Sequence, residues 1–276
     1  MPDIATQEKP SSRDLARAGS RVIAIANQKG GVGKTTTAIN LGTALAACGK
    51  RVLIIDLDPQ GNASTGLGVT RAQRGRGSYQ LVFGEIDIAT DATVSPVPNL
   101  SIVPASVDLS GAEIELVNAG NREYRLRDAL RRSPTGFDYV LIDCPPALGL
   151  LTLNALVAAD AVLVPLQCEF YALEGLSHLM RTIERVRRAF NPSLEIQGVV
   201  LTMFDKRNNL SDMVAEDVRG YFGAKVYDTV IPRNVRVSEA PSHGKPVLLY
   251  DLACAGSQAY VHLAGEVLKR EKRLSA

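Results

Sequence analysis

The fold of this chain follows from one stretch, Gln28-Lys29-Gly30-Gly31-Val32-Gly33-Lys34-Thr35-Thr36-Thr37. It follows an apolar, β-branched run at residues 22–26. It leads into a segment whose apolar residues recur at three- and four-residue steps as far as Cys48, which predicts a helix with one apolar face. A strand, a glycine turn and a helix N-terminus in this order form an anion site, because backbone N–H groups and the helix dipole both favour negative charge there.

The residue types in this stretch predict a nucleoside triphosphate as the anion. The backbone N–H groups from Gly30 to Thr35 can converge on phosphate oxygens, and Lys34 can reach the β- and γ-phosphates. The Thr35 hydroxyl can ligate Mg²⁺. The alternative is a glycine turn without a ligand. We therefore expect the nucleotide to be bound by these residues: Gly30, Gly31, Val32, Gly33, Lys34, Thr35 and Thr36.

The stretch departs from the ordinary P-loop pattern, which requires glycine at the position of Gln28. A lysine stands instead just before a glycine pair. Lys-Gly-Gly-Val-Gly-Lys-Thr-Thr resembles the deviant Walker A motif of the ParA/MinD superfamily. The resemblance implies that Lys29 crosses a dimer interface to touch the nucleotide of the partner.

Further apolar runs alternate with helix-like segments along the chain. The run at 51–57 is apolar on both faces, as in a central parallel strand, and together with the first strand and helix it forms a βαβ unit. We predict an α/β, P-loop NTPase-like three-layer fold, with a mostly parallel central sheet and helices on both faces. Residues 21–276 are expected to form a single domain after a flexible tail at 1–20. Later strands are predicted at 100–103, 139–143, 161–166, 196–204 and 225–231. Residues 69–98 are expected to hold a basic, solvated loop and then a short helix that starts at Ser78 and ends at Gly84. The run at 232–246 is loop-like, and the last helix is predicted from Ser257, as its N-cap, to about Arg273.

Two aspartates are predicted at the same edge of that sheet. Asp58 begins where the 51–57 strand ends, and Asp143 closes the apolar run at 139–142 in the manner of a Walker B strand. Ligands of parallel α/β sheets lie beyond the carboxyl ends of the strands, so both carboxylates can meet Lys34 there. We expect Thr35, Asp58 and Asp143 to hold Mg²⁺, and Lys29, Lys34, Asp58 and Asp143 to be catalytic. A capping aspartate in a turn is the alternative for Asp58.

Two later stretches narrow the resemblance to ParA proper, the chromosome and plasmid partition ATPases: 167–175 and 232–246. The family places residues matching Pro232, Asn234 and Met203 around the adenine. It uses arginines matching Arg207 and Arg236 for DNA, for which the alternative is a surface charge without a partner. Glu169 resembles a residue near the dimer interface, although an acid at a helix start explains it as well.

The bulk composition limits the other function classes. The net charge of +2 is small, so nucleic-acid binding must come from local patches or from dimerisation. The four cysteines show no paired spacing, which favours reduced, buried thiols and argues against an iron–sulfur or zinc site. Residues 1–20 contain no apolar leader core, and no run is apolar enough to span a membrane. We expect a cytoplasmic protein, associated with the nucleoid if the resemblance holds.

The resemblance implies a DNA-partitioning ATPase. An ATP- and Mg²⁺-bound homodimer would bind non-specific double-stranded DNA, and a ParB-type centromere-binding protein would stimulate the hydrolysis that ends this state. A MinD-like membrane ATPase is the alternative, but only Leu274 follows Leu268 among bulky apolar residues at the C-terminal end. A third class is a metabolic enzyme on the same scaffold, either a dethiobiotin synthetase-like ligase or a metal-cluster reductase. The scattered cysteines disfavour the reductase.

Overall fold

Seven strands form one sheet in the order β3-β4-β2-β5-β1-β6-β7. The computed structural model describes residues 20–133 and 136–274. All neighbouring strands are parallel except β3, which pairs antiparallel with β4 at the edge. The strand bounds are β1 Arg21–Ile25, β2 Val52–Asp56, β3 Thr93–Val94, β4 Leu100–Val103, β5 Tyr139–Asp143, β6 Ala161–Gln167 and β7 Glu195–Thr202.

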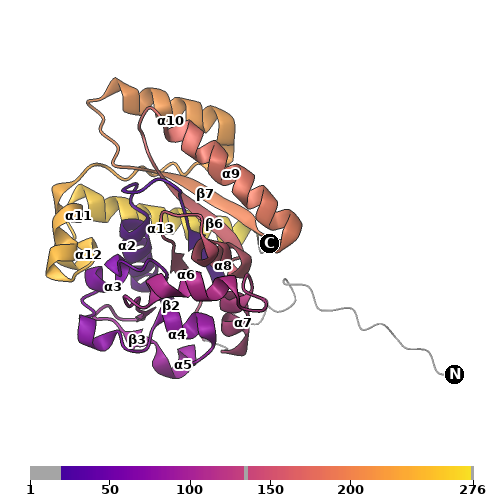
Figure 1. Cartoon of the computed structure of the whole chain (residues 1–276). Helices are drawn as coiled ribbons and strands as arrows, with labels where there is room; N and C mark the ends of the chain where they lie inside the picture. Colours follow the sequence, from indigo (N-terminus) through magenta and orange to yellow (C-terminus); the bar gives the residue numbers. More distant parts are fainter. Residues whose placement is uncertain (1–19, 134–135, 275–276) are drawn as a thin grey trace.

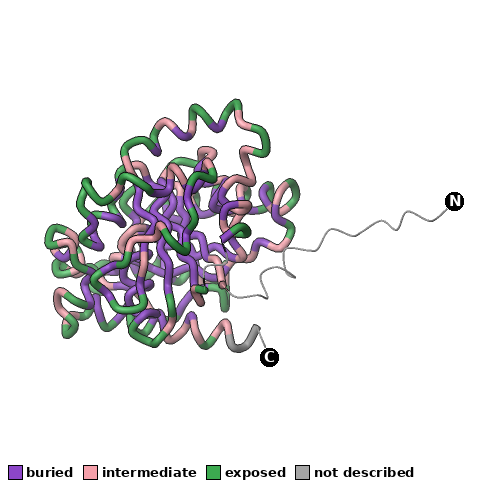
Figure 2. The backbone as a smooth tube through the Cα atoms, turned by 90° about the horizontal axis from the view of Figure 1, so that it is seen from below, coloured by how far each residue is buried: buried purple, intermediate pink, exposed green. Residues whose placement is uncertain are grey.

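Helices cover both faces of this sheet, which confirms the three-layer prediction (Figure 1). One core lies between the sheet and the helices α2, α3, α12 and α13. The second core lies under α4, α6, α7, α8, α9 and α10 on the opposite face. Buried backbone fills the interior and exposed segments surround it (Figure 2). The main helices are α2 Lys34–Ala47, α4 Ser78–Phe83, α6 Leu109–Val117, α7 Arg125–Arg132, α8 Leu150–Ala158, α9 Ala172–Ala189, α10 Asn209–Phe222 and α13 Ala255–Leu274.

The central strands β1, β2 and β5 are continuous apolar runs because both of their faces are covered. In β2 and β5 every residue is buried, including the aspartate that ends each strand. Asp56 and Asp143 are register partners, so their carboxylates reach the same edge of the sheet. The carboxyl end of β1 lies between those of β5 and β6, and the glycine turn leaves it at this edge.

The predicted strand at 225–231 is wrong. The segment contains η2 (Gly223–Lys225) and then an extended stretch that joins β7 only at separate points, such as the N–H of Tyr227 to Val199. The carboxylate of Glu266, from α13, accepts hydrogen bonds from the backbone N–H groups of Asp228 and Thr229. These two N–H groups are therefore not available to a strand ladder, because a side chain of α13 already binds them.

Three other local predictions need correction. The run at 232–246 is not a loop but holds α11 (Val235–Glu239) and η3 (Ala240–His243). In the 69–98 region α4 confirms the predicted short helix, whereas η1 (Arg71–Gln73), α5 (Ile88–Asp91) and β3 lie where a loop was expected. Ser257 does not cap the last helix, which begins at Ala255; its hydroxyl instead donates to the carbonyl of Asp251 at 2.6 Å. The shorter elements α3 (Asn62–Gly66) and α12 (Val247–Tyr250) complete the fold.

Three further expectations concern the cysteines, membrane-spanning helices and the N-terminal tail. Cys144 and Cys168 are buried as expected, but Cys254 is half-buried and Cys48 is exposed; all four are free thiols. No helix in the described part of the chain is long and apolar enough to cross a bilayer. The predicted flexible tail lies, apart from Ser20, outside the described residues.

Candidate functional site

The glycine turn between β1 and α2 forms an open cradle. Gly31 and Gly33 have φ values of 74° and 88°, a region that residues with a Cβ adopt only at a cost. A Cβ built on Gly30 or Gly31 would meet no atom within 4 Å, so this side of the turn is open to a ligand. The N–H of Thr37 bonds to the carbonyl of Gly33 at 2.9 Å, which starts α2 directly behind the turn. The N–H groups at the start of α2 then face the cradle.

A side chain from the far end of the sheet fixes this cradle. The hydroxyl of Thr202, the last residue of β7, donates to the carbonyl of Val32 at 2.8 Å, and both residues are buried. The following residue, Met203, has a φ of 50°, and its Cε lies 3.9 Å from a Cβ built on Gly33. This places Met203 against the glycine turn, as expected for a residue beside a bound nucleotide.

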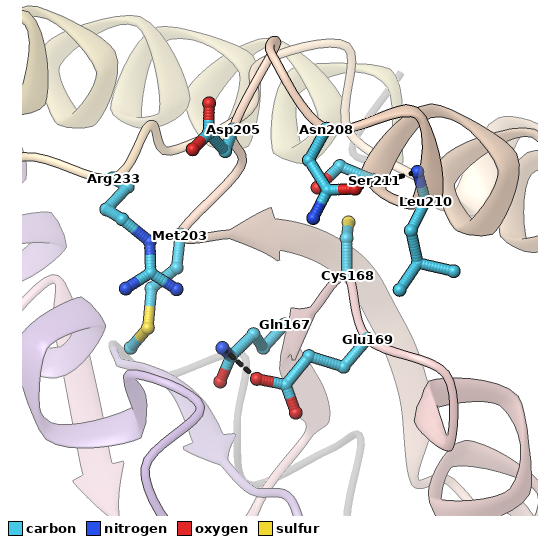
Figure 3. Close-up of a pocket in the computed structure, with 9 residues that line it drawn as sticks. All are labelled: Gln167, Cys168, Glu169, Met203, Asp205, Asn208, Leu210, Ser211 and Arg233. Atoms are coloured by element: carbon cyan, nitrogen blue, oxygen red, sulfur yellow. Dashed lines mark hydrogen bonds between the residues drawn. The ribbon is translucent and has the colours of Figure 1, made fainter.

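The two lysines of the motif point in different directions. The Nζ of Lys34 is buried and donates to the backbone carbonyl of Lys29 at 3.1 Å, across the mouth of the turn. Burial lowers the pKa of Lys34, while the charges of Asp143, Cys144 and Asp58 oppose that shift. The Lys29 side chain leaves the turn instead and forms an ion pair with Glu169 at the surface. Glu169 also accepts a hydrogen bond from the Gln167 side chain (Figure 3).

Asp143 is a buried carboxylate that lacks well-aligned hydrogen-bond donors in the described part of the chain. It is fully buried, and neither of its oxygens has a hydrogen-bond partner of good geometry among the described residues. Burial raises the pKa of Asp143 well above its usual range, and the charge of Asp56 adds to this shift. The neighbouring Thr35 hydroxyl acts in the opposite direction. Two buried, unpartnered oxygens beside a hydroxyl form the hard-oxygen set that Mg²⁺ prefers, so these residues fit the cation.

Asp58 lies in the loop that follows β2, close enough to Asp143 for its charge to act on that carboxyl. It is buried, and its Oδ1 accepts a hydrogen bond from the N–H of Gln60 at 3.0 Å. The capping role considered as an alternative is therefore present. A cap uses one lone pair of a carboxylate, so it leaves acceptor capacity for a water molecule or a cation. The cap and the proposed catalytic role are compatible.

Sequence reasoning missed Asp56, the residue that supports Asp58. The Oδ2 of Asp56 accepts hydrogen bonds from the N–H and the hydroxyl of Ser64 at 2.8 and 2.6 Å, and its Oδ1 accepts one from the N–H of Asp58 at 3.3 Å. Burial raises the pKa of Asp56 to about 6, although the Ser64 hydrogen bonds oppose this. The sequence does indicate Asp56, because it is a carboxylate at the end of an otherwise apolar strand. Asp58 lies only two residues later and matches the same pattern.

The three residues expected around the adenine come from neighbouring segments. Pro232 forms an isolated bridge with Phe204, which brings the 232–236 segment beside the loop that contains Met203. Asn234 uses its side-chain oxygen to cap α11, accepting from the N–H of Arg236 at 2.9 Å. Met203 also lines a cavity of about 370 Å³ beyond the ends of β6 and β7, together with Glu169 (Figure 3). Pro232 and Asn234 are not in its lining, which comprises Gln167, Cys168, Glu169, Met203, Asp205, Asn208, Leu210, Ser211 and Arg233.

The two expected DNA-binding arginines are exposed but paired. Arg207 holds Asp205 with two hydrogen bonds of 2.9 Å, which lower the pKa of Asp205 to about 2. Arg236 pairs with Glu239 at 3.0 Å and with Asp251 at 3.5 Å. The Phe204–Pro232 bridge brings their segments together, but each positive charge is partly compensated. The alternative of an arginine without a partner is therefore wrong for both.

Comparison with solved structures defines the class of this fold. A structure described as cobyrinic acid a,c-diamide synthase from Mycobacterium smegmatis, with bound ADP and magnesium, superposes with a TM-score of 0.80 at 38% identity, covering 92% of this chain and 96% of that one. The cell division ATPase MinD of Pyrococcus furiosus superposes with a TM-score of 0.75 at 28% identity, covering 91% and 99%. The fold and the glycine turn are those of a P-loop ATPase.

Sequence comparison then gives the family. A family model described as an AAA domain matches residues 20–196. The chromosome partitioning protein ParA of Caulobacter vibrioides is 68% identical over 254 residues, covering 91% of this chain and 95% of the relative. The sporulation initiation inhibitor protein Soj of Bacillus subtilis is 54% identical over 247 residues, covering 90% and 98%. The chain belongs to the ParA family of partition ATPases, as its motifs predicted.

Proposed function

We propose that this chain hydrolyses ATP as a switch that segregates DNA. With ATP bound, two copies form a sandwich dimer that holds non-specific double-stranded DNA. Hydrolysis, stimulated by a ParB-type centromere-binding protein, ends this state. The Caulobacter vibrioides relative, named as a chromosome partitioning protein, supports the role, and at 68% identity it is nearer in sequence than the 38% identical synthase. Turnover is phosphoryl transfer to water, with Asp58 orienting the water and the lysines stabilising the transferring charge.

The observation that carries the dimer proposal is the divergence of Lys29 from Lys34. A lysine that served the nucleotide of its own chain would point into the turn, as Lys34 does. Lys29 instead lies at the surface with Glu169, with 39% of its side chain exposed. It can exchange this carboxylate for a phosphate on a second copy, because an exposed ion pair contributes only about 1 kcal/mol or less. A cation supplied in trans is worth about 10³–10⁵ in rate.

The assignment of ATP and Mg²⁺ as cofactors rests on the glycine turn and on the carboxylates beside it. In this proposal the open glycine turn accepts the phosphates, and Met203, Pro232 and Asn234 contact the adenine. Thr35, Asp58 and Asp143 would hold Mg²⁺, which neutralises charge on the phosphates when bound. The unpartnered oxygens of Asp143 are the feature that supports this set.

The DNA surface is proposed on the paired segments that contain Arg207 and Arg236. Dimerisation doubles the number of arginines available to one duplex. This matters because affinity rises steeply with the number of phosphates neutralised. The carboxylates beside each arginine explain why a single copy would bind DNA weakly. DNA phosphates have to compete with Asp205, Glu239 and Asp251 for these guanidinium groups.

A gel-shift assay on DNA of arbitrary sequence tests the proposal directly. We expect a shift with ATP or a non-hydrolysable analogue and none with ADP. Lys29→Ala should retain ATP binding but lose both the dimer, measured by light scattering, and the shift. Lys50→Ala, which removes a charge at the far end of α2, is the control. An equal shift with ADP, or a Lys29→Ala variant that dimerises normally, would falsify the switch.

A further inference from the structure

The loop that contains Asp58 has a second support outside the site already described. Arg74 lies in the 69–77 segment, which the sequence presents as a basic, solvated loop. Its guanidinium is half-buried and donates to the carbonyl of Gly61 at 3.3 Å and to the hydroxyl of Thr65 at 2.9 Å. The same side chain donates to the carbonyl of Val69 at 2.8 Å. One arginine therefore ties the start of α3 to the segment that follows it.

The contact with Gly61 is built into the backbone. Gly61 has a φ of 65°, and a Cβ placed on it would lie 2.4 Å from the Nη1 of Arg74. Its N–H closes the turn by bonding to the carbonyl of Asp58 at 2.8 Å. The guanidinium therefore lies against the residue that ends the Asp58 turn. Arg74 therefore contacts the residue whose N–H closes the turn onto Asp58.

Asp56 holds the opposite side of the same loop. Its carboxylate bonds to the N–H of Asp58 and to Ser64, and the hydroxyl of Ser64 accepts from the N–H of Ala105 at 3.0 Å. Asp56 thus restrains the loop from the sheet side, and Arg74 restrains it from the outer side. The guanidinium carries the charge-assisted hydrogen bonds, which are about twice as strong as neutral ones.

From this geometry we infer that Arg74 is a positioning residue for hydrolysis: it holds the Asp58 loop in the conformation that orients the attacking water. The inference rests on the proposed role of Asp58. Arg74 is not a catalytic residue, because its hydrogen bonds go only to Gly61, Thr65 and Val69. Its neighbours differ from it: the Arg71 side chain is exposed and makes no hydrogen bond or ion pair within the described residues, and Arg76 pairs with Asp91.

The test compares Arg74→Met with Arg71→Met, a matched loss of charge in the same segment. We expect kcat for ATP hydrolysis to fall about 10- to 100-fold in Arg74→Met, because small misplacements of a reacting group cost this much. The affinity for a fluorescent ATP analogue should stay within about 2-fold, since the glycine turn is not involved. Arg71→Met should retain kcat within about 2-fold. Arg74→Lys, which can reach one of the acceptors, should recover part of the rate.

Thr65→Val provides a second, milder variant in case Arg74→Met does not fold. It removes the hydroxyl that accepts from Arg74 and that donates to the carbonyl of Gly61 at 3.0 Å, so it loosens the same contact and should lower kcat several-fold with unchanged ATP affinity. Normal kcat in both folded Arg74→Met and Thr65→Val would overturn the inference, as would an equal loss in Arg71→Met. A parallel fall in ATP affinity would also overturn it, because that indicates general damage. Asp58→Ala separates the two claims: if that variant hydrolyses ATP normally, the proposed function of Asp58 fails first.

Discussion

The loops after β1 and β2 each lead to or contain a catalytic candidate, but different contacts shape them. The glycine turn is set largely by its own residues: Gly31 and Gly33 supply the left-handed backbone, and the N–H of Thr37 closes onto Gly33. The Asp58 loop depends on side chains from elsewhere, with Asp56 beneath it and Arg74 outside it. A binding element can be encoded locally, because it needs only a cradle of N–H groups. A side chain that orients the attacking water must be held in one position, and this requires contacts from other segments.

The largest expected effect comes from the locally encoded loop. Lys34→Ala removes the buried ammonium that closes the mouth of the turn, and we expect ATP binding to be lost and turnover to fall by about 10³-fold or more. Titration with a fluorescent ATP analogue measures the first and phosphate release the second. Lys50→Ala, just beyond the C-terminal end of α2, is the control. If Lys34→Ala binds ATP tightly, the assignment of the glycine turn is wrong.

The Asp58 loop should show the opposite pattern. Asp58→Ala is expected to keep ATP and DNA binding while kcat drops about 10²–10⁴-fold, because the group that orients the water is gone. Asp58→Asn separates the two roles of this side chain. Asparagine can still cap the N–H of Gln60 but lacks the charge, so it should be nearly as slow as alanine. An active Asp58→Asn variant would mean that Asp58 serves only as a cap.

A smaller effect concerns the pH dependence of stability, through Asp56. Its pKa of about 6 in the folded state lies above the ordinary value of 3.8, so the folded protein holds this proton more tightly than the unfolded chain. The resulting stabilisation is full below pH 4 and is lost as the pH rises through 6, by about 3 kcal/mol in total. Urea unfolding of the nucleotide-free protein in EDTA, at intervals from pH 4 to 7.5, measures it.

The matched variant for this prediction is Asp56→Asn, which does not titrate. Its free energy of unfolding should decline less over this pH range than that of the unaltered protein. An absolute loss of stability in the variant is expected at every pH, because the amide places a donor near the N–H of Asp58. The diagnostic quantity is therefore the difference in slope. Parallel curves for the two proteins would show that Asp56 does not titrate in this window.

The elements predicted correctly share a strong local signal. The runs ending in Asp56 and Asp143 are apolar on both faces, which marks central parallel strands whatever surrounds them. The segment at 225–231 carried a similar apolar pattern but failed as a strand, because Glu266 occupies two of its N–H groups. Arg74 and Arg76 were predicted in a solvated basic loop, and both in fact form specific bonds to neighbouring segments. A charge pattern does not reveal the partner that a side chain finds after folding.

The sequence by itself determined the central parallel strands, the glycine turn, the two aspartates at one edge and the family. It could do so because backbone freedom at glycine and apolar runs of strand length are properties of consecutive residues. Only the tertiary structure decided that Lys29 turns away from Lys34 to Glu169, that the buried Asp143 finds no hydrogen-bond partner of good geometry among the described residues, and that Asp56 and Arg74 hold the Asp58 loop from two sides. These are contacts between residues distant in sequence, and they exist only once the packed sheet and helices have brought those residues within hydrogen-bonding distance.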